Sequence, residues 1–477
     1  MLYTTINTLN DDILLCVFDY YRLDKQNDWN VLLGWRKLSH VCRRWRHLVY
    51  SSAFHLDIRI QCTYGTPIVD TLDHLPFLPL NLLYGDAAGT TSEQDELGIH
   101  HALLLRDRVR SIDLSFPPLI LHKFFVLMDE PFPILEDLRL FSTADERMSP
   151  KIPKTFLAPN LRSVILVSIG LPKGLSLLSS TASLVTLKLL AIQTSDYLFP
   201  RKLVSRLRSL PQLENLVIDL SHDNPHWHPS TALGKLGIPV TLPSLKDLTF
   251  DGSSAYLECL VAQIRAPRLE KVNIMLFSQT TFALPHLAHF INITEGLKLP
   301  TAEVCFRSLD VSLNMDKCST PWRIGSFFLS VRSKQLDQQI LHAIHIFRAL
   351  ILALSGVETL RLGMDDRIPM EEQTSEVNST TWHDLLRPFI GAKELRICPP
   401  LSQELSWALQ EDDVGSDPEF LPCLQELVSE FLWEDADAPF DSFIHARRVA
   451  DRPVRSLFLR SNPIREKHRV HSAPRQA

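Results

Sequence analysis

A short apolar motif recurs through most of this 477-residue chain and constrains its fold more than any other feature. Each copy reads apolar-x-x-apolar-x-apolar, and many copies are introduced by a proline two positions before the first apolar residue. Because side chains alternate across a strand, the last two apolar residues predict a short strand with one buried face. One such strand cannot bury that face alone, so the recurrence predicts stacked strands that share a single core.

The spacing of the copies indicates which type of repeat architecture they form. Their middle apolar positions are separated by steps of 23 to 32 residues in the first part of the chain and 30 to 35 near the end, close to the ~20–29 residues of leucine-rich repeats. We therefore expect an irregular leucine-rich-repeat solenoid, with a helix or irregular segment after each strand. The middle positions are Ile112, Leu138, Val164, Leu187, Leu216, Leu248, Val272, Leu360, Leu395, Leu427 and Leu457.

The register loosens between residues 272 and 360. There the pattern predicts one degenerate copy over residues 306–311 and a longer helix over residues 335–354. The same motif also occurs in ordinary α/β proteins, where such strands form one doubly wound sheet, as in hydrolase-like enzymes. The number of copies and their recurring proline favour the solenoid.

Residues 10–48 carry a different, helical pattern. Asn10 is a suitable N-cap, and Asp11 and Asp12 place negative charge at the positive end of the following helix. Apolar residues then recur at helical spacing in two segments, which predicts two amphipathic helices, with a break of the second near residues 39–40 as an alternative. Two helices that merely pack together would show the same pattern. The recurring residues are Ile13, Leu14, Val17, Phe18 and Tyr21 in the first segment, and Trp35, Leu38, Val41, Trp45 and Leu48 in the second.

This N-terminal segment resembles the F-box family. In that family an acidic residue, two aliphatic residues and an aliphatic-Phe pair precede a Val-Cys-basic-x-Trp-Arg signature, and the usual proline after the opening leucine is Asn10 here. The matching residues are Leu9, Asp12, Ile13, Leu14, Val17, Phe18, Val41, Cys42, Trp45 and Arg46. The chain as a whole is similar to fungal F-box-like proteins with divergent repeats.

The resemblance implies that the chain works by bringing two other proteins close together. The helices would dock on the Skp-type adaptor of a cullin–RING (SCF-type) ubiquitin ligase, and the solenoid would hold an unknown protein substrate. Trp45 and Leu48 would mainly hold the helices together. We expect adaptor contacts from Leu9, Asn10, Asp12, Ile13, Leu14, Val17, Phe18, Val41, Cys42 and Trp45.

The predicted substrate surface comes from strand geometry. Residues that flank each middle apolar position point away from the core, onto the concave face of a solenoid. They mix both charges, which suits a protein surface better than a polyanion. These residues are Asp137, Arg139, Thr186, Lys188, Asp247, Thr249, Lys271, Asn273, Thr359, Arg361, Glu394 and Arg396.

Composition and motifs exclude several other functions. The net charge of −6 gives no basic bias towards nucleic acid, and no apolar run is long and uncharged enough to suggest a membrane span. Eight scattered cysteines and the lack of a signal peptide predict an intracellular protein, cytoplasmic or nuclear. No nucleotide, nucleophile-elbow or zinc motif is present, so we expect no enzyme, cofactor or metal. His222, His226 and His228 are read as a solvated loop, and His342 and His345 as structural residues of a helix.

The predicted organisation has four parts: an F-box-like helical module at 1–55, a linker with capping strands at 56–105, the solenoid at 106–460, and a basic, disordered tail at 461–477. Alternating residues over 51–60 predict a short strand, and residues 74–84 a second one. Residues 411–441 hold eleven acidic residues and no Lys or Arg, whereas residues 446–477 are rich in arginine. We read these ends as a solvated loop and a frayed basic tail, with charge pairing between them as the alternative. A second functional hypothesis is a leucine-rich-repeat interaction scaffold with no link to ubiquitin.

Overall fold

The computed structural model describes residues 9–23, 34–52, 55–56, 58–65, 68, 72, 78–85, 92–143, 149–171, 176–193, 199–220, 239–279, 282–316, 325–364, 379–398, 401–409, 420–431 and 440–460. The chain divides into two compact units. The first comprises Met1–Leu198 with Ser209–Leu213, and the second comprises Phe199–Arg208 with Glu214–Ala477. Each unit is described by itself below.

Three short helices form the N-terminal module of the first unit: α1 (Asp11–Leu23), α2 (Gly34–Val41) and α3 (Arg43–Ser51). The predicted N-cap is confirmed, because the Asn10 side chain accepts a hydrogen bond from the Ile13 amide at 2.9 Å. The second amphipathic segment breaks at Cys42, two residues beyond the predicted position. Cys42 has an extended backbone, and its Sγ caps α3 by accepting from the Trp45 amide at 3.4 Å.

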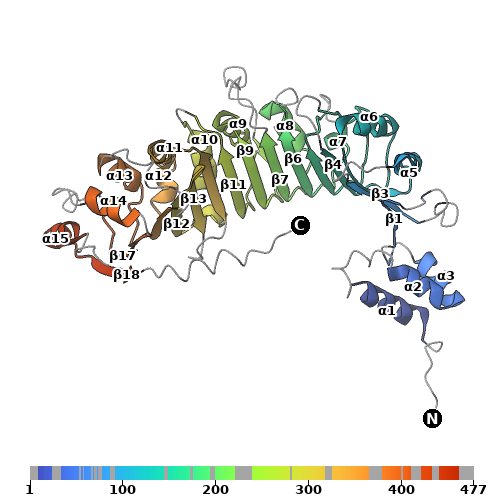
Figure 1. Cartoon of the computed structure of the whole chain (residues 1–477), viewed down its shortest axis with the longest axis horizontal. Helices are drawn as coiled ribbons and strands as arrows, with labels where there is room; N and C mark the ends of the chain where they lie inside the picture. The colour runs from blue at the N-terminus through green and yellow to red at the C-terminus, as the bar shows by residue number, and fades with distance from the viewer. Residues whose placement is uncertain are drawn as a thin grey trace, which may run out of the picture. The chain divides into compact units, whose positions relative to one another are not determined.

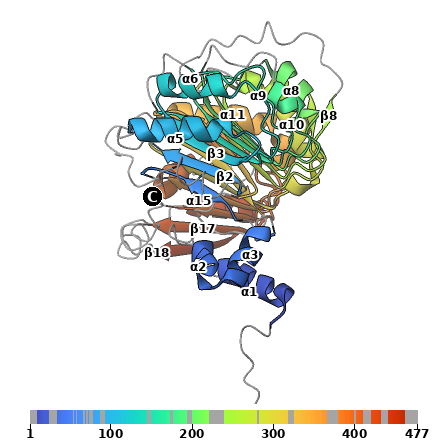
Figure 2. The same ribbon diagram turned by 90° about the vertical axis from the view of Figure 1, so that its right-hand side faces the viewer.

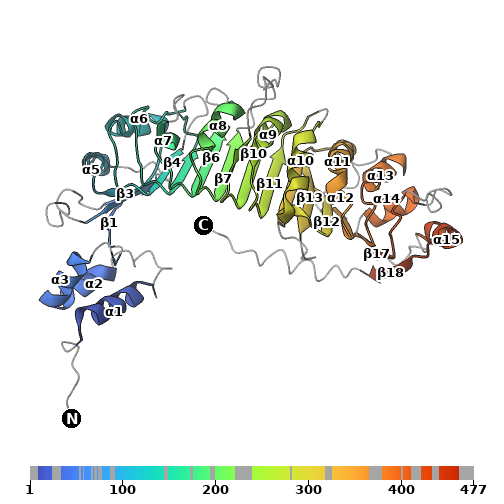
Figure 3. The same ribbon diagram turned by 180° about the vertical axis from the view of Figure 1, so that it is seen from behind.

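The rest of the first unit is a parallel ladder in strict chain order (Figure 1). Its strands are β1 (Ile60–Cys62), β2 (Leu80–Gly85), β3 (Val109–Phe116), β4 (Asp137–Ser142), β5 (Ser163–Val167) and β6 (Thr186–Ile192). Helices α5 (Glu93–Leu104), α6 (Pro118–Leu127) and α7 (Ser176–Ser179) cover one face of these strands (Figures 1 and 3). The ladder begins earlier than the sequence pattern indicated, because β1 and β2 pair in parallel ahead of β3.

The apolar motif fills the space between strands and helices. Its middle residues lie side by side on adjacent strands, as in the register Ile112–Leu138–Val164–Leu187, and each is fully buried. The last motif position forms a second buried row, and the first forms a third. Each strand therefore depends on its neighbours for burial, as in a repeat protein.

The recurring proline has a local explanation. In six copies it follows the first residue of a turn, whose carbonyl accepts a hydrogen bond from the amide of the first motif leucine three residues later. Proline fixes φ near −65° and has no N–H, which suits the second position of such a turn. The turns are 132–135, 158–161, 210–213, 242–245, 266–269 and 421–424.

Charges alternate along the edge where the strands begin. In the first unit the Glu136 amide donates to the Arg110 carbonyl and the Arg162 amide to the Glu136 carbonyl, each at 2.8 Å, and the Arg110 and Glu136 side chains form an ion pair at 3.0 Å. The second unit repeats this arrangement with Glu214, Lys246 and Glu270. Its Lys246–Glu214 ion pair measures 2.9 Å. Neighbouring repeats thus present opposite charges to each other.

The second unit is also a ladder, interrupted once by antiparallel strands. Its strand order is β7 (Asn215–Leu220), β9 (Asp247–Gly252), β11 (Lys271–Leu276), β14 (Phe327–Arg332), β13 (Asp310–Asp316), β12 (Thr301–Phe306), β15 (Thr359–Met364), β16 (Glu394–Ile397), β17 (Glu426–Phe431) and β18 (Arg455–Arg460). Strand β13 pairs antiparallel with both β12 and β14, and all other neighbours pair in parallel. Strands β8 (Val240–Thr241) and β10 (Ile264–Arg265) form a separate small sheet.

The helices of the second unit lie on one face of its strands (Figure 2). They are α8 (Pro200–Leu207), α9 (Ser254–Val261), α10 (Pro285–Ile293), α11 (Leu336–Ala349), α12 (Ile351–Leu354), α13 (Ser379–Leu386), α14 (Leu401–Ala408) and α15 (Asp441–Val449), with a 3-10 turn η5 (Glu295–Leu297). A doubly wound sheet has helices on both faces and a reversal of strand order. In the described part of each unit the helices lie on one face of the strands only, so the doubly wound alternative is wrong.

Three other sequence expectations are corrected. The strand expected over residues 51–60 is not found in the described part of that range, because α3 continues to Ser51 and β1 begins only at Ile60. The proposed degenerate copy at 306–311 spans the turn between β12 and β13, where Leu309 is exposed instead of lying in the core. The predicted long helix over 335–354 forms as two helices, α11 and α12, that meet at Leu350.

The end of the second unit corrects the expected frayed tail. Arg447 of α15 is fully buried and donates hydrogen bonds to the carbonyls of Phe420, Leu421 and Leu424 at 3.1–3.2 Å. Leu421 has φ of 42°, an unusual value for a residue with a side chain, and the Arg447 contacts hold this turn. The acidic segment lies partly, and the tail beyond residue 460 entirely, outside the described residues.

Candidate functional site: interaction surfaces of the helical module and of the strands

The core of the helical module is built from its signature residues. Phe18 and Trp45 make an edge-to-face contact with ring centroids 4.8 Å apart. Leu14, Phe18, Leu48 and Val49 are buried, while Trp45 is half-buried. These side chains hold α1 against α3, as expected for Trp45 and Leu48.

Two arginines of α3 fix the ends of the other helices. The Arg44 guanidinium binds the Asp11 carboxylate at 2.7 Å and the Leu9 carbonyl at 2.6 Å, which ties α3 to the start of α1. Arg46 donates from Nε to the Ser39 carbonyl at 2.9 Å and so fixes α2. Arg46 of the signature and its neighbour Arg44 therefore have a structural role in this module.

A second apolar stripe of α1 faces outward. Ile13, Val17 and Tyr20 follow i, i+4, i+7 spacing, so they share one side of the helix, and their exposed fractions are 48, 45 and 73%. Val41, the last residue of α2, is also 58% exposed. An apolar stripe beside a formed core is the kind of surface that protein partners cover.

The ten residues expected to contact an adaptor thus divide into three groups by their exposure. Asn10, Asp12, Ile13, Val17 and Val41 are exposed, whereas Leu14 and Phe18 lie in the core of the module. The remaining three, Leu9, Cys42 and Trp45, are half-buried. Tyr20 belongs to the exposed stripe and was absent from the expected set, although its spacing from Ile13 could have indicated it.

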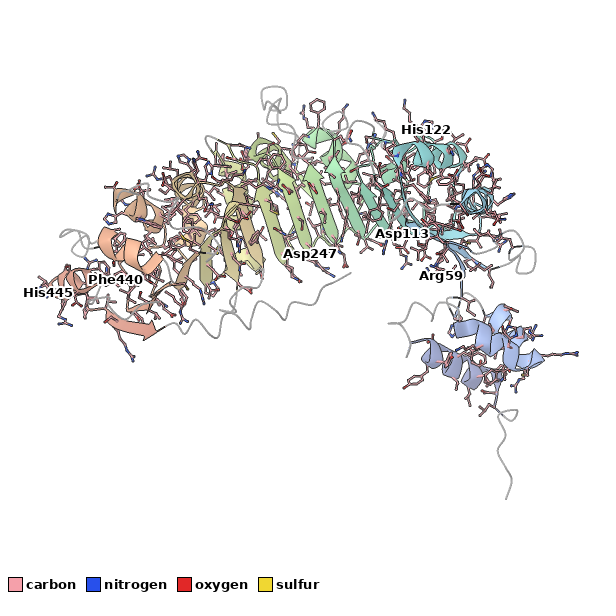
Figure 4. All side chains as sticks on the ribbon, in the orientation of Figure 1. Arg59, Asp113, His122, Asp247, Phe440 and His445 are labelled. Carbon is pink, nitrogen blue, oxygen red and sulfur yellow. The ribbon has the colours of Figure 1, made fainter. Side chains whose placement is uncertain are left out.

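The residues expected to bind a substrate all lie on the strand face opposite the buried rows. On β4 and β6 these are Asp137, Arg139, Thr186 and Lys188, which are half-buried except for the exposed Arg139. In Figure 4, Asp113 of the neighbouring β3 points from the side of the sheet away from the helices. Asp113 and Arg139 approach each other at 3.9 Å, and burial raises the pKa of the Asp113 carboxyl against the opposing effect of Arg139.

The corresponding face of the second unit carries more internal ion pairs. Arg361 contacts Glu303 at 3.5 Å, and Arg396 contacts Glu394 at 2.7 Å. These contacts make much of the surface on β12, β15 and β16 self-neutralising. The remaining expected residues there are the exposed Lys271 and the half-buried Asp247, Thr249, Asn273 and Thr359.

One group of residues on the first unit's open strand face, the face opposite the buried rows, was not expected. Phe141, Ile165, Val167 and Leu190 occupy positions that a repeat strand normally gives to polar residues, and all four are half-buried. The uninterrupted apolar run Val164-Ile165-Leu166-Val167 could have indicated this, because strands with only one buried face alternate.

The described residues hold no cluster of three or more His, Cys, Asp or Glu side chains that could bind a metal ion. His342 is buried against the Phe282 ring, and burial lowers its pKa, which agrees with the expected structural role. His222, His226 and His228 lie outside the described residues. Within the described part of the chain, none of the helices has the length and apolarity needed to cross a membrane.

Comparisons with known proteins give a likeness among solved structures alone. No protein-family model matches the chain, and no curated protein matches it. Among solved structures, the leucine-rich repeat-containing protein LegL7 from Legionella pneumophila is similar over 81% of this chain and 97% of its own, with 12% identity and a TM-score of 0.25. That similarity is too low to bear on function. The fold is described by the strand ladders themselves: each unit stacks its leucine-rich motif copies on neighbouring strands, an arrangement that resembles a leucine-rich-repeat fold.

Proposed function

We propose that this protein is the substrate-recognition subunit of an SCF-type ubiquitin ligase. The helical module docks on a Skp-type adaptor and, through it, on a cullin, while the open strand faces hold a target protein. The chain then acts by bringing two proteins together and performs no bond-making step itself. It would work in the cytoplasm, the nucleus or both.

The exposed stripe of α1 carries this proposal. Part of the F-box signature forms the core of the module, in which Leu14 is buried, Phe18 contacts Trp45 and Cys42 caps α3. Ile13 and Val17 lie outside that core, although they also occupy F-box positions. Because they do not stabilise the module from within, we assign them to contact with the adaptor. A partner that covers them would bury apolar surface worth about 25 cal/mol per Å².

The alternative is an interaction scaffold of the leucine-rich-repeat type without a ubiquitin link. The open strand faces favour it, because they mix acidic, basic and apolar side chains and require no adaptor in order to bind a protein. Under this alternative the helical module only caps the chain. Adaptor binding separates the two functions.

The test is co-purification of a recombinant Skp-type adaptor with the full chain and with the variant Ile13→Asp/Val17→Asp. Both side chains are about half exposed, so the variant should fold, whereas charging Leu14 or Phe18 would bury a carboxylate in the core. The matched control is Leu97→Asp, since Leu97 is an exposed α5 residue with a 58% exposed fraction.

We expect the wild type and Leu97→Asp to capture the adaptor and Ile13→Asp/Val17→Asp to lose at least tenfold in affinity, or about 1.4 kcal/mol. Circular dichroism should show the same helix content in all three proteins. Failure of the wild type to capture the adaptor would reject the ubiquitin-ligase assignment and leave the scaffold. Equal capture by all three proteins would show that the adaptor does not contact this stripe.

A further inference from the structure

The apolar residues on the open face of the first unit form a continuous row. The parallel register places Phe141 beside Val167 and Val167 beside Leu190, on three successive strands. Ile165 lies two residues before Val167 on the same face of β5. We call these four residues the apolar row. Helices α5 to α7 cover the opposite face of the sheet (Figure 3).

Two cations flank the apolar row. The register places Arg139 and Lys188 on either side of Ile165. Among the described residues, Lys188 has no ion pair or hydrogen bond, and the Arg139 guanidinium makes only the 3.9 Å contact with Asp113, which is too long for a hydrogen bond. Among the described open-face residues of β3 to β6, the acidic groups are Asp113 and Asp137, and both lie on β3 and β4 together with Arg139. The open face of β5 and β6 is largely apolar, and its one charged side chain is Lys188.

The spacing of the row indicates the shape of an occupant. Neighbouring strands lie ~4.8 Å apart, so the row from Phe141 to Leu190 spans ~10 Å. Residues i, i+4 and i+7 of a helix span ~10.5 Å along its axis, with successive side chains ~5–6 Å apart. An extended segment places same-side residues ~6.6 Å apart, which matches the row less well.

We propose that the apolar row binds an acidic amphipathic helix of a partner protein, with apolar side chains on the row and carboxylates facing Lys188 and Arg139. This inference deepens the proposed function, because it rests on the open strand face being the target-binding surface. The binding mode is that of an amphipathic helix laid on an apolar surface, with its charges set by the flanking cations.

The probe is a fluorescently labelled, alanine-based helical peptide of about five turns, ~18 residues, with leucines at i, i+4 and i+7 and glutamates beside them. Two matched peptides replace the glutamates with lysines or the leucines with serines. Fluorescence anisotropy with the full chain should show the glutamate–leucine peptide binding about tenfold more tightly than either matched peptide.

Variants locate the site. Lys188→Glu should reverse the preference so that the lysine peptide binds better, and Ile165→Thr/Val167→Thr should weaken binding about tenfold while keeping β-branched residues in the strand. The matched controls are Lys271→Glu, on an open strand position of the second unit, and Val126→Thr, at a 61% exposed position of α6. Neither control should alter peptide preference.

Three results would each overturn the inference: equal binding of the glutamate and lysine peptides, no saturable binding up to ~1 mM, or identical effects of Lys188→Glu and Lys271→Glu. The adaptor capture assay on the same preparations keeps the two proposals apart. Adaptor capture without peptide preference would reject the apolar row as a helix site and leave the ligase assignment. Peptide preference without adaptor capture would support the row on a scaffold protein.

Discussion

Two glycines at the same position of two successive turns allow one prediction to be worked out in detail. Gly356 is the third residue of the turn 354–357, and Gly391 is the third residue of the turn 389–392. A Cβ atom at Gly391 would lie 2.3 Å from the Ser355 carbonyl oxygen and 3.2 Å from that of Val357. At Gly356 the nearest atom, the Ala353 carbonyl oxygen, would be 3.8 Å away. We predict that Gly391→Ala destabilises the protein and that Gly356→Ala does not.

The size of this destabilisation follows from the distance by which the backbone must shift to admit the new Cβ atom. An ordinary contact to Cβ begins at 3.4 Å, so the two backbones at Gly391 would have to separate by about 1 Å. Overpacking of this kind costs about 1–3 kcal/mol. Alanine also restricts the unfolded chain and so stabilises by about 0.4–1 kcal/mol, but this contribution is common to both variants. The difference between the variants therefore isolates the steric contribution, and we expect it to be about 2 kcal/mol.

Urea unfolding monitored by circular dichroism gives the comparison, with amide hydrogen exchange of β15 and β16 as a local readout. Repeat proteins can unfold in parts, so the exchange data show whether the loss is confined to these two strands. We expect faster exchange there in Gly391→Ala alone. Equal stability of the two alanine variants would refute the reasoning, because it would mean that the turns separate freely.

Three further predictions concern buried polar groups. Arg447→Met should cost about 3–5 kcal/mol, since it leaves the carbonyls of Phe420, Leu421 and Leu424 without donors, and thermal unfolding would measure it. Glu258→Ala should cost about 1–3 kcal/mol of stability. The Glu258 carboxylate of α9 accepts hydrogen bonds from the amides of His286 and Leu287 at 2.9 and 2.8 Å and so caps α10. Unchanged hydrogen exchange of the α10 amides would contradict this. Burial lowers the pKa of His342 below its ordinary value of 6.5, so the unfolded chain takes up a proton at a higher pH than the folded chain does. Stability should therefore fall as the pH drops below 6.5. In His342→Gln the urea midpoint should depend less on pH in this range.

The local parts of this structure could be predicted from the sequence. The Asn10 cap and the proline turns depend on residues within three positions of one another, so the residue types nearly determine the geometry. The buried rows follow for the same reason, because the alternation of a strand fixes which side chains share a face. The open-face positions of Asp137 and Arg139 are a direct consequence.

The non-local parts could not be predicted. Apolar spacing defines two adjoining stripes on α1, but only the packing of α3 decides that Leu14 and Phe18 face inward and Ile13 and Val17 outward. The antiparallel insertion of β12 and β13 depends on pairing between strands, which leaves no periodic signal of its own. Arg447 was assigned to a tail because its composition is basic, whereas carbonyls from a turn more than twenty residues earlier hold it inside.

The alternating charges at the strand entrances restrict how such an array can change in length. Removal of the repeat that contains Glu136 would bring Arg110 against Arg162, two like charges at a position where the present neighbours attract. Removal of two adjoining repeats, those with Glu136 and Arg162, would instead bring Arg110 beside Val185, whose amide now donates to the Arg162 carbonyl, and no like charges would meet. Over this charged run the edge therefore disfavours loss of the single middle repeat more than loss of two adjoining ones.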